Sequence, residues 1–185
     1  MRSKKTQKNS NDKRIKRIIR LIAKGRTDEA IRLFEADDLE QVYEYGVGVG
    51  REGDLVNAGK IFDVVTQLRP DSAEVWFNKG VVLQQIGRIE DAIDCYDRAT
   101  KIHRDYLMAW YNKGANLSEM GRYHDAVKCY DETIRIDPHH TKAWLNKGFA
   151  LSKLGKNEEA FKCYDETTRI DPKDALAWNN KGALL

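Results

Sequence analysis

Residues 109–138 read AWYNKGANLSEMGRYHDAVKCYDETIRIDP, and residues 143–172 read AWLNKGFALSKLGKNEEAFKCYDETTRIDP. The two stretches are near copies of one another, 34 residues apart. A looser copy begins AEVWFNKG at residue 73, and a partial copy, ALAWNNKGALL, occupies residues 175–185. A period of this length is typical of repeat architectures in which each repeat is one supersecondary unit.

The tryptophans, cysteines and prolines all follow this period. They are Trp76, Trp110, Trp144 and Trp178; Cys95, Cys129 and Cys163; and Pro70, Pro138 and Pro172, with Arg104 at the vacant proline position. Random placement would not bring three residue types into phase, so the repeat extends over most of the chain.

The repeats resemble the tetratricopeptide repeat (TPR) family. Its pattern has a large, a small and a large residue in the first helix, a small, an aromatic and a small residue in the second, and a closing proline. The matching residues of one repeat are Trp110, Gly114, Leu117, Ala126, Tyr130, Thr133 and Pro138. The resemblance covers about residues 39–185. It implies an all-α fold, a right-handed α-solenoid of stacked antiparallel helix hairpins.

The glycines of the pattern have physical explanations. A glycine inside a helix costs about 1 kcal/mol relative to alanine, so Gly114 and Gly148 indicate positions where the second helix packs closely. We expect the small residues Ala126 and Ala160 to lie opposite them. Further glycines are expected to end the first helix of each pair, where a left-handed residue is preferred; they are Gly53, Gly87, Gly121 and Gly155.

Seven segments are predicted along the chain. They are a disordered basic tail (1–10), a degenerate first hairpin (11–38), a weak repeat (39–72), three full repeats (73–106, 107–140 and 141–174) and a truncated repeat with a first helix only (175–185). In the first hairpin, Ile15, Ile18, Ile19 and Ile22 form one apolar stripe, and Ala30, Leu33 and Phe34 are expected in its second helix. The weak repeat has Val42 in place of tryptophan and glycines at 46, 48 and 50, so we expect it to be the least stable.

Charge is unevenly distributed. The net charge is +3, yet residues 1–24 hold ten basic side chains and one acid, Asp12. This basic arm could bind nucleic acid or an anionic surface by counterion release. Alternatively, it is only a solubilising tail or an extra helix with one charged face. No stretch reaches the roughly 18 apolar residues of a membrane span. The odd number of cysteines fits a reducing compartment, and we expect a cytoplasmic location.

Catalytic and metal sites are not indicated. Equivalent cysteines of stacked hairpins are separated by at least one helix, about 10 Å, which is too far for a disulfide or a zinc site. His139 and His140 lie in a turn without a third ligand, and the carboxylates recur with the repeat as on a solvated helix face. The chain contains no phosphate-binding loop or nucleophile elbow. We therefore expect no enzyme activity, cofactor or metal.

An asparagine–lysine pair recurs in each first helix. The asparagines are Asn78, Asn112, Asn146 and Asn180. Because asparagine is unfavourable inside a helix unless its side chain finds a partner, we expect a ladder of contacts between neighbouring hairpins. The lysines Lys79, Lys113 and Lys147 are expected to lay their alkyl stems on the core and extend the ammonium group outward.

The resemblance implies that first helices line a concave, partner-binding groove. The residues carried onto this groove are Phe77, Val81, Gln84, Gln85, Tyr111, Ala115, Ser118, Glu119, Leu145, Phe149, Ser152 and Lys153. Some family members hold the C-terminal carboxylate of chaperone tails with lysine and asparagine at the first two of these positions. Here those positions are apolar or aromatic, which favours an amphipathic helix or an extended apolar peptide. Alternatively, these side chains only pack between first helices.

The sequence therefore predicts a protein–protein interaction scaffold that binds a peptide or helix of a partner. Two alternatives stay open: an accessory module of a larger enzyme, such as a protein glycosyltransferase, and a nucleic-acid-associated adaptor acting through the basic arm. We also predict concentration-dependent self-association through an uncapped C-terminal face formed by Trp178, Leu184 and Leu185.

Overall fold

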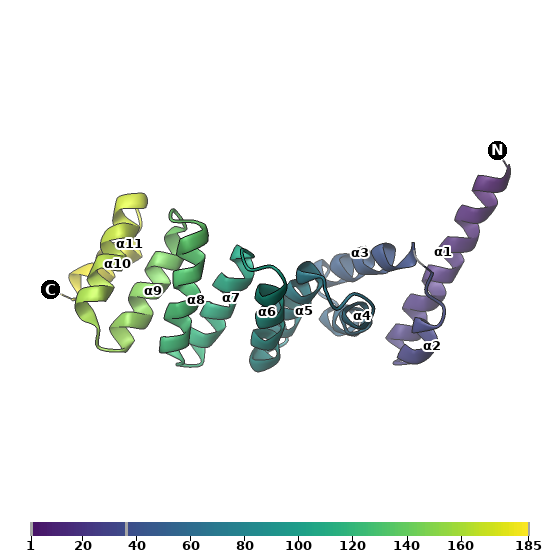
Figure 1. The fold of residues 1–185 in the computed structure, drawn as a ribbon, viewed down its shortest axis with the longest axis horizontal. Coiled ribbons are helices and arrows are strands. Elements are labelled where there is room, and N and C mark those ends of the chain that lie inside the picture. Colours follow the sequence, from purple (N-terminus) through teal and green to yellow (C-terminus); the bar gives the residue numbers. More distant parts are fainter. Residues whose placement is uncertain (1, 36, 185) are drawn as a thin grey trace. The chain divides into compact units, whose positions relative to one another are not determined.

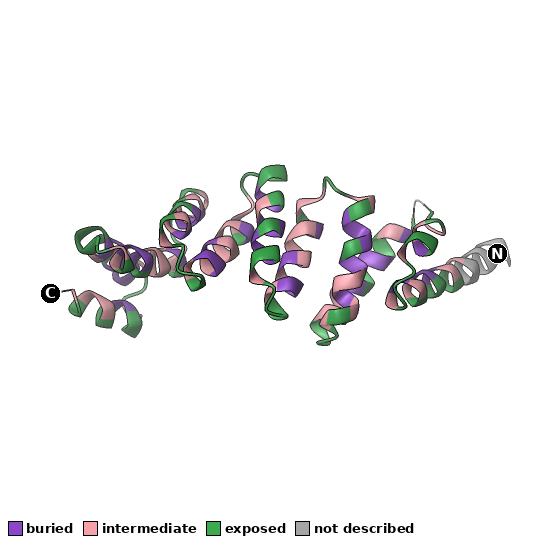
Figure 2. Cartoon of the chain, turned by 90° about the horizontal axis from the view of Figure 1, so that it is seen from below, coloured by how far each residue is buried: buried purple, intermediate pink, exposed green. Residues whose placement is uncertain are grey.

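The computed structural model describes residues 2–35 and 37–184, with side chains from residue 11 onward. This part of the chain forms eleven α-helices and no strand. It divides into two compact units, Met1–Ile102 and His103–Leu185. Most helices have buried residues along one side and exposed residues along the other (Figure 2), as expected of amphipathic helices that pack in pairs.

Unit 1 contains six helices (Figure 1). They are α1 (Arg2–Ala23), α2 (Thr27–Ile31), α3 (Asp38–Arg51), α4 (Leu55–Leu68), α5 (Ala73–Gln85) and α6 (Ile89–Ile102). Helix α3 pairs with α4 and α5 with α6, while α4 also packs on α5. Successive hairpins are thus stacked, as the repeat predicts.

Unit 2 repeats this arrangement with five helices. They are α7 (Leu107–Glu119), α8 (Tyr123–Ile136), α9 (Thr141–Lys153), α10 (Asn157–Ile170) and α11 (Ala175–Gly182). Helices α7 and α8 form one hairpin, α9 and α10 the next, and α11 packs on α10. The predicted all-α fold of stacked helix hairpins is confirmed.

The glycine that ends each first helix has the predicted left-handed backbone. After α5, Gly87 has a φ of 81°. Its amide donates to the carbonyl of Gln84, and the amide of Arg88 donates to the carbonyl of Leu83. This pair of bonds is the Schellman motif, which satisfies the last carbonyls of a helix. The same pair of bonds ends α3, α7 and α9.

A tyrosine ring covers the glycine inside each of three first helices. A Cβ atom on Gly80 would lie 2.7 Å from Cε1 of Tyr96, and Gly114 faces Tyr130 in the same way. The close packing predicted at these glycines is therefore present. The atoms nearest to these glycines belong to the tyrosine rings, and at Gly114 also to Cys129, rather than to the alanines that were expected opposite them.

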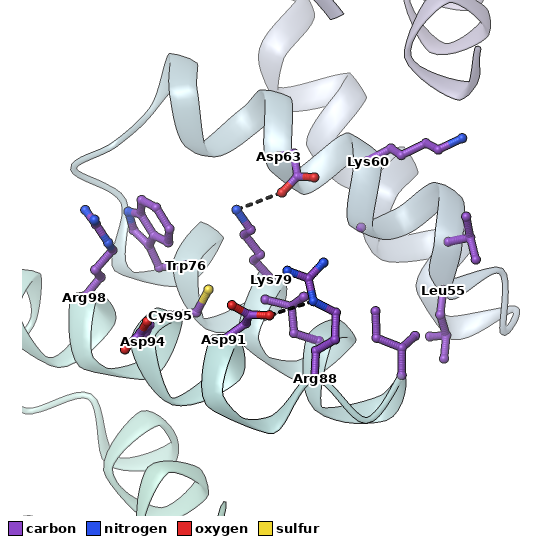
Figure 3. A pocket seen from close by; sticks show the side chains of 14 residues that line it. Leu55, Lys60, Asp63, Trp76, Lys79, Arg88, Asp91, Asp94, Cys95 and Arg98 are labelled. Atoms are coloured by element: carbon purple, nitrogen blue, oxygen red, sulfur yellow. Dashed lines mark hydrogen bonds and ion pairs between the residues drawn. The ribbon is translucent and has the colours of Figure 1, made fainter. Parts of the chain in front are cut away.

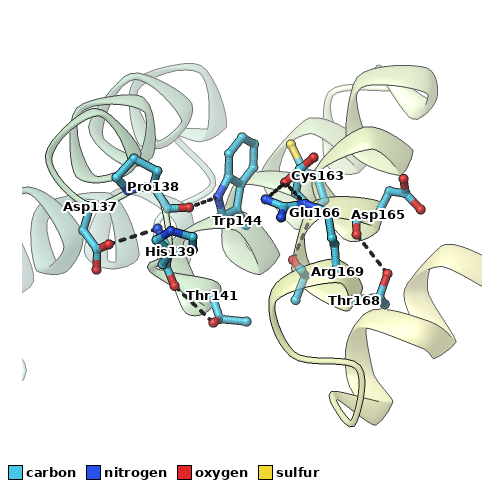
Figure 4. A network of polar contacts seen from close by, with 11 residues as sticks. Asp137, Pro138, His139, Thr141, Trp144, Cys163, Asp165, Glu166, Thr168 and Arg169 are labelled. Atoms are coloured by element: carbon cyan, nitrogen blue, oxygen red, sulfur yellow. Dashed lines mark hydrogen bonds and ion pairs between the residues drawn. The ribbon is translucent and has the colours of Figure 1, made fainter.

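The common phase of tryptophan and proline has a structural cause. The indole Nε1 of Trp144 donates to the carbonyl oxygen of Pro138 at 2.9 Å (Figure 4). Trp76 and Trp178 make the same bond to the proline six residues earlier. Trp110 donates to the carbonyl of Arg104, because any residue supplies a carbonyl at that place. The bond fastens each first helix to the turn that precedes it.

The N-terminal hairpin differs from its prediction in two respects. Helix α1 starts at Arg2, so the backbone of residues 2–10 is helical where a disordered tail was expected; lysine and arginine are good helix formers. The side chains of this segment and residue 1 lie outside the described residues. The second helix, α2, ends at Ile31, so Leu33 and Phe34 pack on the core from a turn rather than from a helix.

The C-terminal face is only partly bare. Trp178 and Leu176 are 52% and 56% exposed. Leu184, which was expected to be uncovered, packs against the cluster of Leu151, Ala160, Cys163 and Tyr164. Leu185 lies outside the described residues. Self-association through the face predicted from Trp178, Leu184 and Leu185 stays a prediction, with Trp178 the exposed member of that set among the described residues.

Candidate partner-binding groove

A hollow of about 360 Å³ lies on the first-helix side of unit 2. Four predicted groove residues line it together with Asn146, Tyr123 and Tyr130; they are Ala115, Ser118, Glu119 and Phe149. Phe149 is 42% exposed. Its ring meets Tyr123 edge-on at 6.3 Å, and the ammonium of Lys153 lies 5.3 Å from its centroid. The hollow thus combines an accessible aromatic ring with a polar rim.

A second hollow, of about 190 Å³, lies between α3 and α5 in unit 1. Of the predicted residues, Val81 and Gln85 line it. The rest of its lining includes Gly46, Val47, Gly50 and Arg51 of the weak repeat. A Cβ on Gly48 would meet nothing within 4 Å, whereas one on Gly46 would lie 2.7 Å from Ile61. Gly46 and Gly50 thus line the hollow, and Gly46 is at the same time closely packed against Ile61.

Several predicted groove residues are held by packing within their own unit. Phe77 is half-buried, and its ring lies 5.8 Å from Tyr96. Gln84 accepts a hydrogen bond from the hydroxyl of Tyr96 at 2.8 Å. Tyr111 is half-buried against Tyr130, at 6.2 Å. These three side chains line neither of the two hollows.

The other three predicted residues, all on α9, differ in exposure. Leu145 packs against the cluster around Leu151. Ser152 is half-buried, and Lys153 is exposed beside Phe149. None of the three lines the unit 2 hollow itself. Phe149 is thus the predicted aromatic groove residue with the largest accessible surface.

Two of the asparagines form the predicted contacts between hairpins. Asn146 on α9 donates to the hydroxyl of Tyr111 on α7 at 3.2 Å. Asn78 on α5 donates to the hydroxyl of Tyr43 on α3 at 2.6 Å. Tyr43 in turn donates to Glu74 at 2.8 Å. The residue corresponding to Tyr43 in the α9 repeat is Leu145, which offers no hydroxyl to Asn180.

The lysines after these asparagines face a different side of the first helix, about 100° away. Lys79 pairs with Asp63 at 2.8 Å, and its ammonium lies 5.3 Å from the centroid of Trp76 (Figure 3). Lys147 does the same with Asp131 and Trp144. These pairs border hollows of about 480 and 450 Å³. The ammonium groups of both lysines are thus neutralised by an aspartate at the surface. This agrees with the prediction that they extend outward from the core.

Burial shifts the titratable thiols and phenols near these hollows toward their neutral forms. Burial raises the pKa of Cys95 and of Cys163 to about 11, which leaves both thiols protonated at neutral pH. Burial also raises the pKa of Tyr111 and Tyr130. In the described residues no three histidine, cysteine or acidic side chains converge to hold a metal ion. Nor is any helix of that part long and apolar enough to cross a membrane.

His140 has a structural role instead of a ligating one. Its Nδ1 accepts the amide of Ala143 at 3.1 Å and so caps α9. Its ring also lies 4.9 Å from that of Tyr111. His139 is exposed in the preceding turn. The two histidines thus have different surroundings, His140 at the start of α9 and His139 exposed in the turn.

The sequence reasoning missed the groove residues that do not belong to a first helix of a full repeat. Tyr123 begins α8, a second helix, and reaches the hollow from there. Val47 and Arg51 belong to the weak repeat, which was not aligned position by position. Such an alignment would have placed Val47 in register with Val81.

Comparisons with known proteins agree with this geometry. A family model described as tetratricopeptide repeat matches residues 73–106, 108–140 and 141–174. A crystal structure of MamA is 26% identical, with a TM-score of 0.71, and the match covers 84% of this chain and 95% of that chain. No curated protein sequence matches.

Two more distant structures share the fold. YrrB, described as a TPR protein with an unusual peptide-binding site, is 19% identical with a TM-score of 0.75 over 97% of both chains. The first TPR domain of Spaghetti (RPAP3), bound to the HSP90 peptide SRMEEVD, is 24% identical with a TM-score of 0.59, covering 61% of this chain and 90% of that one.

Proposed function

The chain belongs to the tetratricopeptide repeat family, and from this premise we propose that it is a non-catalytic scaffold that binds a peptide or helical segment of a partner protein along its first-helix side. The observation that carries the proposal is the hollow around Phe149 in unit 2. An exposed aromatic ring beside a shallow hollow with a polar rim is the kind of surface on which interface hot spots form.

The chemistry of the hollow favours an apolar or amphipathic segment over an acidic tail. At the two clamp positions, α7 has Tyr111 and Ala115, and α9 has Leu145 and Phe149. None of them is a cation that could pair with a carboxylate. Glu119 on the rim would repel an acidic peptide. We therefore propose a ligand with an apolar anchor for Phe149 and Tyr123, and a donor or cation near Glu119.

Two structural neighbours are described as peptide-binding proteins. YrrB is described as having a peptide-binding site, and the RPAP3 domain is bound to a peptide. The acidic peptide of RPAP3 differs from the ligand proposed here, because the clamp residues are absent from this chain. The likeness thus supports peptide binding as a class of function. The type of peptide is inferred from the residues of the groove instead.

Selection from a displayed peptide library tests the proposal. Recovered peptides are titrated against the wild-type chain, Phe149→Ser and the control Val56→Ser. Val56 is 65% exposed and borders the hollow of Figure 3 on α4, so both changes remove an accessible apolar side chain. We expect apolar or amphipathic peptides whose affinity falls by about tenfold or more with Phe149→Ser and is unchanged with Val56→Ser.

The opposite pattern would overturn the proposal. If Val56→Ser removes binding and Phe149→Ser does not, the binding surface lies on the other side of the hairpins. Thermal unfolding of both variants confirms that they fold. A variant of Phe77 or Tyr111 is a poorer choice than Phe149→Ser, because their rings pack on Tyr96 and Tyr130.

A further inference from the structure

Helix α1 has a stripe of cations opposite its apolar stripe. Ile15, Ile18 and Ile22 are 7%, 0% and 1% exposed and belong to the core of unit 1. Five basic residues are exposed and recur at steps of three, one, three and four, so they share one helical face; they are Lys13, Lys16, Arg17, Arg20 and Lys24. At 100° per residue this face is centred opposite the isoleucines.

None of these five cations has an acidic partner among the described residues. The ion pairs of this hairpin use other basic residues: Arg14 pairs with Asp38 and Glu35, and Arg26 pairs with Glu29. Glu29 is close enough to Arg17 for the charge of Arg17 to lower its pKa, but it is already bound to Arg26 at 2.6 Å. The neighbouring acid on α1 itself is Asp12, which is also exposed.

The burial of the isoleucines decides what such a helix can bind. A helix that lies on a membrane inserts its apolar face between the headgroups. The apolar face of α1 is covered by the core of unit 1, so it is not available without unfolding. What remains accessible is a row of cations, which suits a polyanion with closely and regularly spaced charges.

The length of the stripe fits a nucleic acid backbone. From Lys13 to Lys24 the helix rises by about 16 Å. A DNA duplex has one phosphate charge for about every 1.7 Å of its axis when both strands are counted, so a stripe of this length lies within reach of several phosphates. We propose that the outer face of α1 binds the sugar–phosphate backbone of nucleic acid without reading its sequence. This site is separate from the groove around Phe149.

A matched pair of triple variants tests the proposal on the full chain. The stripe variant is Lys16→Gln, Arg20→Gln and Lys24→Gln. The control is Lys142→Gln, Lys162→Gln and Lys173→Gln. All six residues are exposed or half-exposed, and both variants lose the same charge. Glutamine keeps good helix propensity, and circular dichroism checks that both fold.

The measurement is fluorescence anisotropy with a labelled DNA duplex of mixed sequence over a series of salt concentrations. For the wild type, we expect the logarithm of the binding constant to fall linearly with the logarithm of the salt concentration. The stripe variant should weaken low-salt binding by about tenfold or more and reduce the slope by roughly one for each phosphate that it no longer neutralises. The control should keep both the affinity and the slope.

Three results would overturn the proposal. The first is no salt-dependent binding by the wild type. The second is an equal loss in the control, because binding would then follow total charge rather than the stripe. The third is stronger binding to phosphatidylserine vesicles than to the duplex, with loss in the stripe variant, because the ligand would then be an anionic membrane. Phe149→Ser should leave duplex binding unchanged.

Discussion

Gly148 lies beneath the ring of Tyr164, and a Cβ atom added to the glycine would lie 2.6 Å from Cε1 of that ring. Tyr164 is 2% exposed, so the ring has little room to move. The helix gives up about 1 kcal/mol of propensity at this glycine and in return buries a large aromatic side chain between α9 and α10. Gly80 with Tyr96 and Gly114 with Tyr130 repeat the relationship.

Gly148→Ala should therefore destabilise the chain although alanine is the better helix former. Overpacking costs typically about 1–3 kcal/mol, so after the gain in propensity we expect a net loss of roughly 1–2 kcal/mol. The control is Gly182→Ala on α11, where a Cβ would meet nothing within 4 Å. Urea unfolding should show Gly182→Ala neutral or stabilising; equal effects of the two changes would contradict the packing described.

Asn116→Val should stabilise the chain. Asn116 on α7 is 1% exposed, and neither polar atom of its side chain has a hydrogen-bond partner in the described part of the chain. An unpaired buried amide costs about 1–3 kcal/mol. The corresponding residues of the neighbouring repeats, Val82 and Ala150, are apolar and buried. We expect a gain of about 1–2 kcal/mol in the free energy of unfolding.

The control for this change is Asn112→Val, at a half-exposed position on the same helix, which should not stabilise. A loss of stability in Asn116→Val would mean that the amide has a partner, such as a buried water molecule. Differential scanning calorimetry of the two variants decides between these results.

Asp38→Asn should destabilise unit 1 and weaken the response of the protein to acid. The buried carboxylate accepts two hydrogen bonds from Arg14, at 2.7 and 2.9 Å, and one from the amide of Glu35. The bonds from Arg14 lower the pKa of Asp38 below its ordinary value of 3.8. A charge-assisted bond of this kind contributes about 2 kcal/mol.

The lowered pKa determines the sign of the pH dependence. Stability from this carboxylate is present above the pKa of the unfolded chain and is lost as the pH falls through the folded value. The wild type should therefore lose stability below a pH of about 3.8 more steeply than Asp38→Asn. Glu40→Gln, at the exposed pair with Arg69, is the control and should follow the wild type.

The buried thiols predict a second pH effect, with the opposite sign. Burial raises the pKa of Cys95 and Cys163 from 9.0 to about 11. Their contribution to stability is therefore complete below a pH of about 9 and is lost as the pH rises to about 11. The melting temperature of the wild type should fall more over this interval than that of the double variant Cys95→Ala, Cys163→Ala. Parallel curves would show that the thiols are not desolvated.

The structural features that recur in every repeat could be predicted from the sequence. The 34-residue spacing of the tryptophans predicted the helix hairpins. The glycines at positions 87, 121 and 155 predicted where the first helices end. The asparagine contacts could be expected because an unpaired amide in a helix is costly. Which groups these asparagines contact, the hydroxyls of Tyr43 and Tyr111, could not be predicted, because the choice depends on how far one hairpin is rotated against the next.

The irregular parts were harder to predict. The short helix α2 depends on the way in which Leu33 and Phe34 meet the core from a turn. Likewise, the hollow beside α3 depends on how α3 of the weak repeat packs beside α5. The end of α2 and the hollow beside α3 depend on tertiary packing, which cannot be read from a repeat period of 34 residues. For the same reason, the sequence placed Phe77 and Tyr111 in the groove without showing that their rings pack on second helices.

Site-specific photo-crosslinking shows on which side of unit 2 the peptide binds. A photoreactive phenylalanine replaces Phe149 in the groove or, as the control, Lys162, a residue beside the hollow on the other side of unit 2. After irradiation with the selected peptide, mass spectrometry identifies the attached residues. We expect a crosslink from position 149 to an apolar residue of the peptide and none from position 162. A crosslink from position 162 alone would contradict it.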